Sequence, residues 1–155
     1  MNFISAILAG SIIILILCII LAIVMYVLWS VGCMRVLKAL GWQAPWMAWI
    51  PVLSHIALGL AINTDDNKTM KLCGLDIPTF IYAFWIGFYL IAVRIPGVGN
   101  LIGLIVMIAL SGRIYQNIYS RLEGKPESET MIIGFLSGWL GIIPLVKFLS
   151  YKGNR

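Results

Sequence analysis

The sequence predicts an all-α, polytopic integral membrane protein with about four transmembrane helices and one interfacial or re-entrant segment. Three observations support this fold class. The first 34 residues carry no charged side chain. The chain is 61% hydrophobic and only 11% charged, whereas soluble domains average about 25% charged residues. Four further apolar stretches follow the first, so we expect one membrane domain over residues 1–155.

The first predicted span covers residues 4–31. An apolar run of 18 or more residues is long enough for a helix to cross the hydrocarbon core. No Lys or Arg precedes this run, and no small-residue cleavage site follows it. We therefore interpret it as a membrane span and not as a secretory signal peptide.

Residues 35–62 form the interfacial or re-entrant segment. Gly41, Pro45 and Pro51 interrupt any helix in this region. Three indoles at positions i, i+4 and i+7 would share one helical face, and tryptophan favours the membrane interface. We expect them to act as interfacial anchors: Trp42, Trp46 and Trp49. Whether residues 46–62 cross the bilayer is left open.

Three more spans are expected over residues 77–94, 100–118 and 131–149. The first two form a tight hairpin, because Pro96 ends a helix and the neighbouring glycines permit a turn. The polar loops 63–76 and 120–130 should lie outside the hydrocarbon, since burying their charges would be costly.

The basic residues give the orientation. With the N-terminus outside and four spans, seven basic residues face the cytoplasm: Arg35, Lys38, Lys68, Lys71, Arg113, Arg121 and Lys125. Four face outwards: Arg94, Lys147, Lys152 and Arg155. If residues 46–62 also cross, the split becomes six to five. The positive-inside rule favours the four-span arrangement.

Two ionisable residues at membrane depth are candidate polar sites, His55 and Arg94. His55 is the only histidine and could relay a proton or bind a metal. The plainer interpretation is a structural His bonded to backbone groups freed by Pro51. Arg94 either lies on a substrate path or anchors the end of a span by snorkelling.

The last span carries a face of small side chains at i, i+3, i+4 and i+7, namely Gly134, Ser137, Gly138 and Gly141. Small residues let helix backbones approach closely in lipid, and Gly134 and Gly138 have the spacing of the corresponding motif. This candidate helix-packing face contacts either the first span within one chain or a second copy or partner.

The sequence offers no catalytic set, metal site or cofactor motif. No nucleophile elbow, phosphate-binding glycine loop or His/Cys cluster is present. Cys18, Cys33 and Cys73 lack the spacing of a metal site and, being odd in number, argue against a disulfide framework. The net charge of +5 sits at span ends, so we expect contacts with membrane lipids and none with nucleic acid.

Short motifs give the chain a resemblance to a family. They are Gly41-Trp42-Gln43-Ala44, Trp49-Ile50-Pro51, Ile95-Pro96-Gly97-Val98-Gly99-Asn100, and Gly124-Lys125 ahead of a glycine-rich last span. Over most of residues 20–150 the chain resembles small bacterial multi-pass membrane proteins of unknown function that carry a Gly-Trp-x-Ala…Ile-Pro-x-x-Asn pattern. It departs from them by the extra residues 45–48 and by lacking Asn near His55. The resemblance implies topology and a bacterial plasma-membrane location, but no catalytic residue or substrate.

The leading functional hypothesis is a non-catalytic membrane protein acting through helix–helix contacts, as an accessory, immunity or assembly component. Small size and the lack of a catalytic set support it. We expect a membrane-protein partner or a homo-oligomer. The alternatives are a small transporter or channel subunit, suggested by the broken segments with His55 and Arg94, and an intramembrane enzyme.

Overall fold

A computed structural model describes residues 3–64, 68–72 and 74–151. Within these residues the chain is mostly helical, with seven α-helices, one 3₁₀ helix and one two-stranded antiparallel sheet. The predicted helical class is therefore confirmed, while the small sheet was not expected. Two helices, α1 (Phe3–Ala39) and α5 (Gly99–Glu123), are long and apolar enough to cross a membrane.

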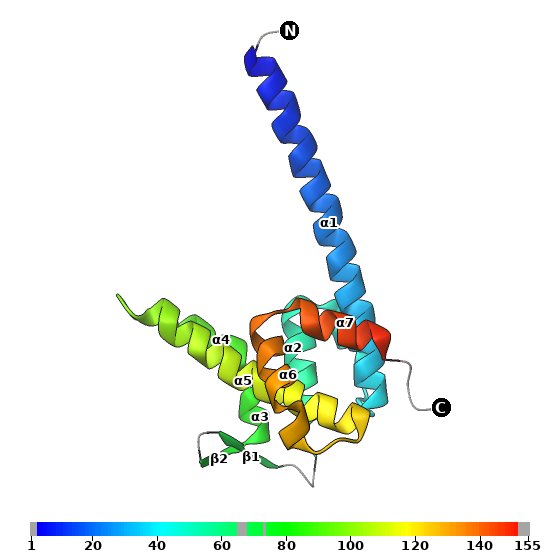
Figure 1. Ribbon diagram of the computed structural model, residues 1–155, viewed down its shortest axis with the longest axis vertical. Coiled ribbons are helices and arrows are strands. Elements are labelled where there is room, and N and C mark those ends of the chain that lie inside the picture. The colour runs from blue at the N-terminus through cyan, green and yellow to red at the C-terminus, as the bar shows by residue number, and fades with distance from the viewer. Residues whose placement is uncertain (1–2, 65–67, 73, 152–155) are drawn as a thin grey trace.

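Helix α1 has two unlike parts (Figure 1). Its N-terminal part extends away from every other element, and the large hydrophobic side chains between Ile12 and Leu28 are 37% to 63% exposed. We call residues 12–28 the arm. The C-terminal part packs against η1, α2 and α7, and Cys33, Val36 and Leu37 are fully buried. We call the packed remainder of the molecule the body.

Residues 40–62 do not continue α1. Gly41 adopts the left-handed conformation that ends the helix, and a 3₁₀ helix, η1 (Pro45–Trp49), follows. Helix α2 (Pro51–Ala61) then begins with Pro51 in its first turn. Residues 42–49 form a turn and a 3₁₀ helix. The shared face that the i, i+4, i+7 spacing of Trp42, Trp46 and Trp49 would give in an α-helix is therefore not formed.

Residues 63–76, expected to be a polar loop, contribute to a hairpin of β1 (Thr69–Leu72) and β2 (Leu75–Pro78). The segment expected as one span over 77–94 is divided into α3 (Thr79–Tyr82) and α4 (Trp85–Ala92). At the division Ala83 presses on α2. A Cβ atom on Gly59 would lie 2.4 Å from the Cα of Ala83, so only glycine permits this approach.

Helices α4 and α5 form the expected hairpin and project from the body as a second extension (Figure 1). Gly97 has a φ of +83° in the turn, which favours glycine. A Cβ atom on Gly99 would lie 2.6 Å from the carbonyl oxygen of Ala92, so the two helices are in close backbone contact at the turn.

The C-terminal half of α5 packs against α6 (Glu127–Trp139), and together they supply much of the body. The segment expected as one span over 131–149 is divided at Leu140 and Gly141, where α7 (Ile142–Ser150) begins in a new direction. Helix α7 returns to α1, where Arg35 Nη1 donates to the carbonyl oxygen of Leu149 at 3.1 Å.

Candidate functional site

The body contains a cavity of about 400 Å³ between α1, α2, α4, α5 and α6. Five of the twelve residues that line it carry aromatic rings of Tyr or Trp: Tyr26, Trp29, Trp85, Tyr115 and Trp139. Tyr26 is 38% exposed and Trp139 is 59% exposed, so the cavity opens at the surface of the body, beside the C-terminal end of the arm. We call it the aromatic cavity.

His55 of α2 lies in the wall of the aromatic cavity. Its ring centroid is 5.4 Å from that of Trp29 and 5.4 Å from that of Trp85, at interplanar angles of 35° and 86°. No hydrogen bond to the His55 ring is formed by the residues that the structure describes. The expected bond to the backbone near Pro51 is made by its neighbour, since Ser54 Oγ donates to the Pro51 carbonyl oxygen at 2.7 Å. His55 is therefore held by ring packing and keeps both nitrogens available.

Two serine hydroxyl groups also line the cavity, and both already donate hydrogen bonds. Ser111 Oγ donates to the carbonyl oxygen of Met107 at 2.5 Å, and Ser137 Oγ donates to that of Ile133 at 2.7 Å. The second hydroxyl is also 2.8 Å from the Tyr119 hydroxyl, which must then be the donor. Each serine can offer a lone pair to a ligand but no proton.

The predicted small-residue face meets α5 and not α1. A Cβ atom on Gly134 would lie 2.7 Å from the backbone nitrogen of Gln116, and one on Gly138 would lie 2.8 Å from that of Gly112. The expected close approach therefore occurs within one chain, although its partner helix differs from the predicted first span. Gly141 stands apart in the turn before α7, where an added Cβ would meet nothing within 4 Å.

Arg94 and His55 are not brought together. Arg94 is exposed in the turn that joins α4 to α5, at the tip of the projecting hairpin (Figure 1), whereas His55 lies in the body. This placement separates the two candidate polar residues and leaves the aromatic cavity without Arg94.

The predicted interfacial anchors also separate. Trp46 and Trp49 of η1 are 60% and 40% exposed, as an interfacial role requires, while Trp42 packs against the core with its indole nitrogen buried. The Tyr26 hydroxyl donates to the Trp49 carbonyl oxygen, so η1 is tied to the base of the arm.

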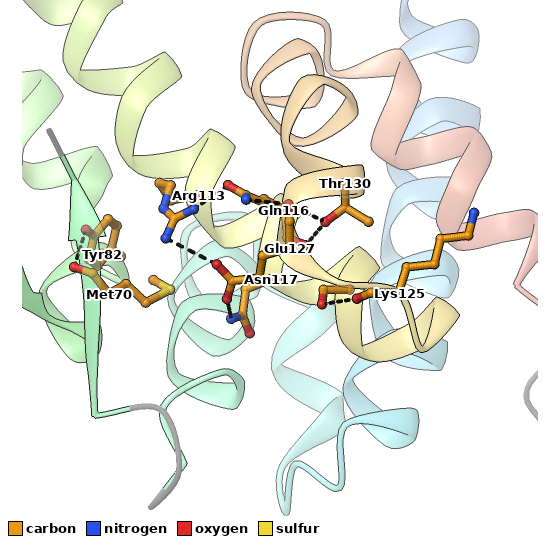
Figure 2. Close-up of polar contacts among 9 residues, drawn as sticks. Met70, Tyr82, Arg113, Gln116, Asn117, Lys125, Glu127 and Thr130 are labelled. Atoms are coloured by element: carbon orange, nitrogen blue, oxygen red, sulfur yellow. Dashed lines mark hydrogen bonds and ion pairs between the residues drawn. The ribbon is translucent and has the colours of Figure 1, made fainter. Parts of the chain in front are cut away.

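A polar cluster between α5 and α6 was missed by the sequence reasoning (Figure 2). Arg113 Nη2 is 3.3 Å from Glu127 Oε2, and Asn117 Nδ2 donates to Glu127 Oε1 at 2.8 Å. Gln116 Nε2 donates to the Glu127 carbonyl oxygen at 2.7 Å, and Thr130 Oγ1 to that of Gln116 at 3.1 Å. Polar residues at i, i+3 and i+4 from Arg113 are the signal that could have revealed it. This cluster fastens the start of α6 to α5.

A second charged group joins α5 to α7 beyond the apolar part of α5. Glu123 forms ion pairs with Lys147 and with Lys125, the latter at 2.9 Å. Bonding to Lys147 and then to Lys125 lowers the pKa of Glu123, and bonding to Glu123 raises the pKa of Lys125. The Lys147 ammonium also lies 5.2 Å from the centroid of the Tyr119 ring.

Residues suited to a metal do not converge: among the described residues, no three His, Cys, Asp or Glu side chains are grouped to hold an ion. Cys73, Asp65 and Asp66 lie outside the described residues. The candidate site is therefore the aromatic cavity, whose lining includes hydrogen-bonding groups.

The comparisons with known proteins add no family to this description. No protein-family model, curated protein or solved structure matches the chain. The resemblance to bacterial multi-pass membrane proteins therefore stays a prediction from short motifs.

Proposed function

We propose that this chain is a multi-pass integral membrane protein of the bacterial plasma membrane that acts without catalysis, through helix–helix contacts with another membrane protein or a second copy. The observation that carries the proposal is the arm. Its apolar side chains are exposed on every side of α1, and soluble monomers rarely expose apolar patches larger than a few hundred Å². Lipid and partner helices are the surroundings that suit such a surface.

An ion pair and a hydrogen bond of α7 favour three crossings over the four expected from the sequence. Lys147 pairs with Glu123 at the end of α5, and Leu149 accepts from Arg35 at the end of α1. A fourth crossing would put the two partners of each contact on opposite sides of the bilayer. We therefore propose that α6 and α7 enter and return, while α1, α3–α4 and α5 cross.

The distribution of basic residues supports this arrangement. Among the described residues, eight Lys and Arg belong to the body: Arg35, Lys38, Lys68, Lys71, Arg113, Arg121, Lys125 and Lys147. Arg94, at the tip of the hairpin, is the ninth. With the body on the cytoplasmic side, this eight-to-one division follows the positive-inside rule more closely than the seven-to-two split that the four-span arrangement gives for the same nine residues.

Single cysteines test the topology. In a chain whose three cysteines are replaced by serine or alanine, cysteine is introduced at Val98, Ser128 or Ser150, which are all exposed. In intact cells an impermeant maleimide should label Val98→Cys alone, and permeabilisation should add Ser128→Cys and Ser150→Cys. Labelling of Ser150→Cys in intact cells would show that α6 and α7 cross the bilayer, as in the four-span arrangement.

A photo-crosslinking scan of the arm tests the proposed contacts. A photoreactive residue is placed at each position from 12 to 28, and products of defined mass are recorded in native membranes. Crosslinks that recur every three or four residues identify a partner helix on one face, and their mass separates a second copy from another protein. Crosslinking to lipid alone at all positions contradicts the proposal.

A transport role is the second candidate, supported by the aromatic cavity beside His55. Arg94 does not support this role, because it lies in the turn between α4 and α5 and not in the aromatic cavity. Purified protein in liposomes should then conduct a solute flux that His55→Gln reduces, with expression and insertion unchanged. Absence of flux across a panel of protons, alkali cations and small organic ions removes this candidate.

A further inference from the structure

We propose that the aromatic cavity binds an uncharged, membrane-soluble alcohol, that is, an amphiphile with an apolar body and a hydroxyl head. The cavity volume of about 400 Å³ falls within the range of ligand sites. Its lining is that of such sites too: rich in aromatic rings, with a few converging polar groups. The proposal rests on the proposed membrane setting of the arm for the ligand's route of entry, and not on which protein the arm contacts.

The charge of the lining selects an uncharged ligand. No Asp, Glu, Lys or Arg is among the described residues that line the cavity. A buried carboxylate or ammonium would lack a counter-charge there, which is costly in an apolar site. The Trp29 ring already packs against His55 and Phe148, with ring centroids 5.4 and 5.9 Å away, so a cation–π contact would have to come from the other rings of the lining.

The hydrogen-bond inventory selects a hydroxyl head. Ser111 Oγ and Ser137 Oγ already donate hydrogen bonds to backbone carbonyl oxygens, but each retains a lone pair that can accept a hydrogen bond. His55 keeps an uncommitted ring N–H that can donate. One hydroxyl group can donate to a serine and accept from His55, whereas an ether or ester oxygen can only accept.

The position of the opening selects a ligand that arrives from lipid. Tyr26 contributes to the cavity wall and belongs to the exposed apolar arm. Trp139, on the other side of the opening, is exposed, and so are its neighbours Leu140 and Ile142. An alkyl chain leaving the cavity would therefore run along apolar side chains.

Two glycines provide a matched pair of variants. Gly141 lines the cavity with a φ of −58°, and a Cβ atom there would meet nothing within 4 Å, so Gly141→Leu should fill the cavity without displacing the backbone. Gly87 of α4 has the same free space but does not line the cavity, so Gly87→Leu is the control.

Tryptophan fluorescence measures binding. The full chain, with Trp46→Phe and Trp49→Phe to remove the exposed indoles of η1, is placed in lipid nanodiscs. Four probes share one dibrominated dodecyl chain, whose bromine atoms quench nearby indoles: the alcohol, its methyl ether, the trimethylammonium and the carboxylate. We expect saturable quenching by the alcohol, lost in Gly141→Leu and kept in Gly87→Leu.

Substitution of His55 tests the role of its ring nitrogens. His55→Phe keeps an aromatic ring between Trp29 and Trp85 and removes the hydrogen bond. The alcohol should bind about fivefold more tightly than the ether, as the hydrogen bond that only the alcohol can donate to a serine predicts. His55→Phe should weaken both probes about fivefold and leave their ratio unchanged, because each accepts from His55. A merely structural role of His55 would leave both affinities unchanged.

Three outcomes overturn the proposal. The first is quenching that rises linearly with every probe and does not saturate, which is collision in the bilayer. The second is saturable quenching that is equal in Gly141→Leu and Gly87→Leu, which places the site elsewhere. The third is tightest binding of the trimethylammonium probe, which would make the cavity a cation site.

Discussion

The two parts of α1 are both rich in apolar residues and have opposite surroundings. From Ile12 to Leu28 the large side chains are at least 37% exposed, whereas Cys33, Val36 and Leu37, a few residues further on, are fully buried by the rest of the chain. Helix α5 repeats the contrast, since Leu101 and Ile105 are exposed and Ile114 and Ile118 are buried. Apolar composition therefore does not show which side chains the rest of the chain covers, and tertiary contacts decide that.

The largest expected effect is on stability, and it should differ between the packed part of α1 and the arm. Leu37→Ala should lower the free energy of unfolding by about 3 kcal/mol, because it opens a cavity in the core of the body. Leu21→Ala, in the arm, should change it by less than about 0.5 kcal/mol, because no part of the chain covers that side chain. Denaturant unfolding in detergent measures both, and equal losses would mean that the arm is folded against the body.

The second prediction concerns the glycines of the body and the projecting hairpin. Gly134→Leu should cost about 2 kcal/mol, since its Cβ would overlap the backbone of Gln116 and force α5 and α6 apart. Gly87→Leu should leave stability unchanged, because its Cβ meets open space. Thermal unfolding of the detergent-solubilised monomer distinguishes them. A stable Gly134→Leu monomer that loses inter-chain crosslinks would instead assign this face to a partner.

The smallest effect is the pH dependence of the tie between α5 and α7. Glu123 has a folded-state pKa below its ordinary value of 4.5, so its ion pairs stabilise the folded state above that pH and are lost as the pH falls through the lowered pKa. Glu123→Gln should cost about 0.5 kcal/mol at pH 7, as partly exposed pairs do, and progressively less as the pH falls through the lowered pKa. Glu129→Gln is the control, and a pH-independent cost for Glu123→Gln would exclude the ionic mechanism.

Local chemistry made part of the fold predictable. The turn at Pro96 and Gly97 and the close approach through Gly134 and Gly138 follow from the conformations and sizes of those residues, and the structure contains both. The division of the last segment at Leu140 and Gly141 was missed because its uninterrupted hydrophobicity does not show where a helix changes direction.

The candidate site depended on long-range contacts and was harder to predict. His55 was selected because it is a lone ionisable residue, yet the features that make a site around it come from α1, α4, α5 and α6. No spacing along the chain brings Trp29, Trp85 and Ser111 together. The break in the helix at Gly41 was predictable from the glycine and prolines of residues 41–51, but the 3₁₀ helix that separates the indoles of residues 42–49 was not.

The reactivity of the fully buried Cys33 thiol can measure how often this part of the molecule opens. An alkylating reagent can reach that sulfur only when α1 and its neighbours separate, so the modification rate under fast-closing conditions equals the intrinsic rate multiplied by the fraction of open molecules. In a chain carrying only this cysteine, the rate would report the local opening free energy in an intact bilayer. It would do so without denaturant, at the point where the arm becomes part of the body.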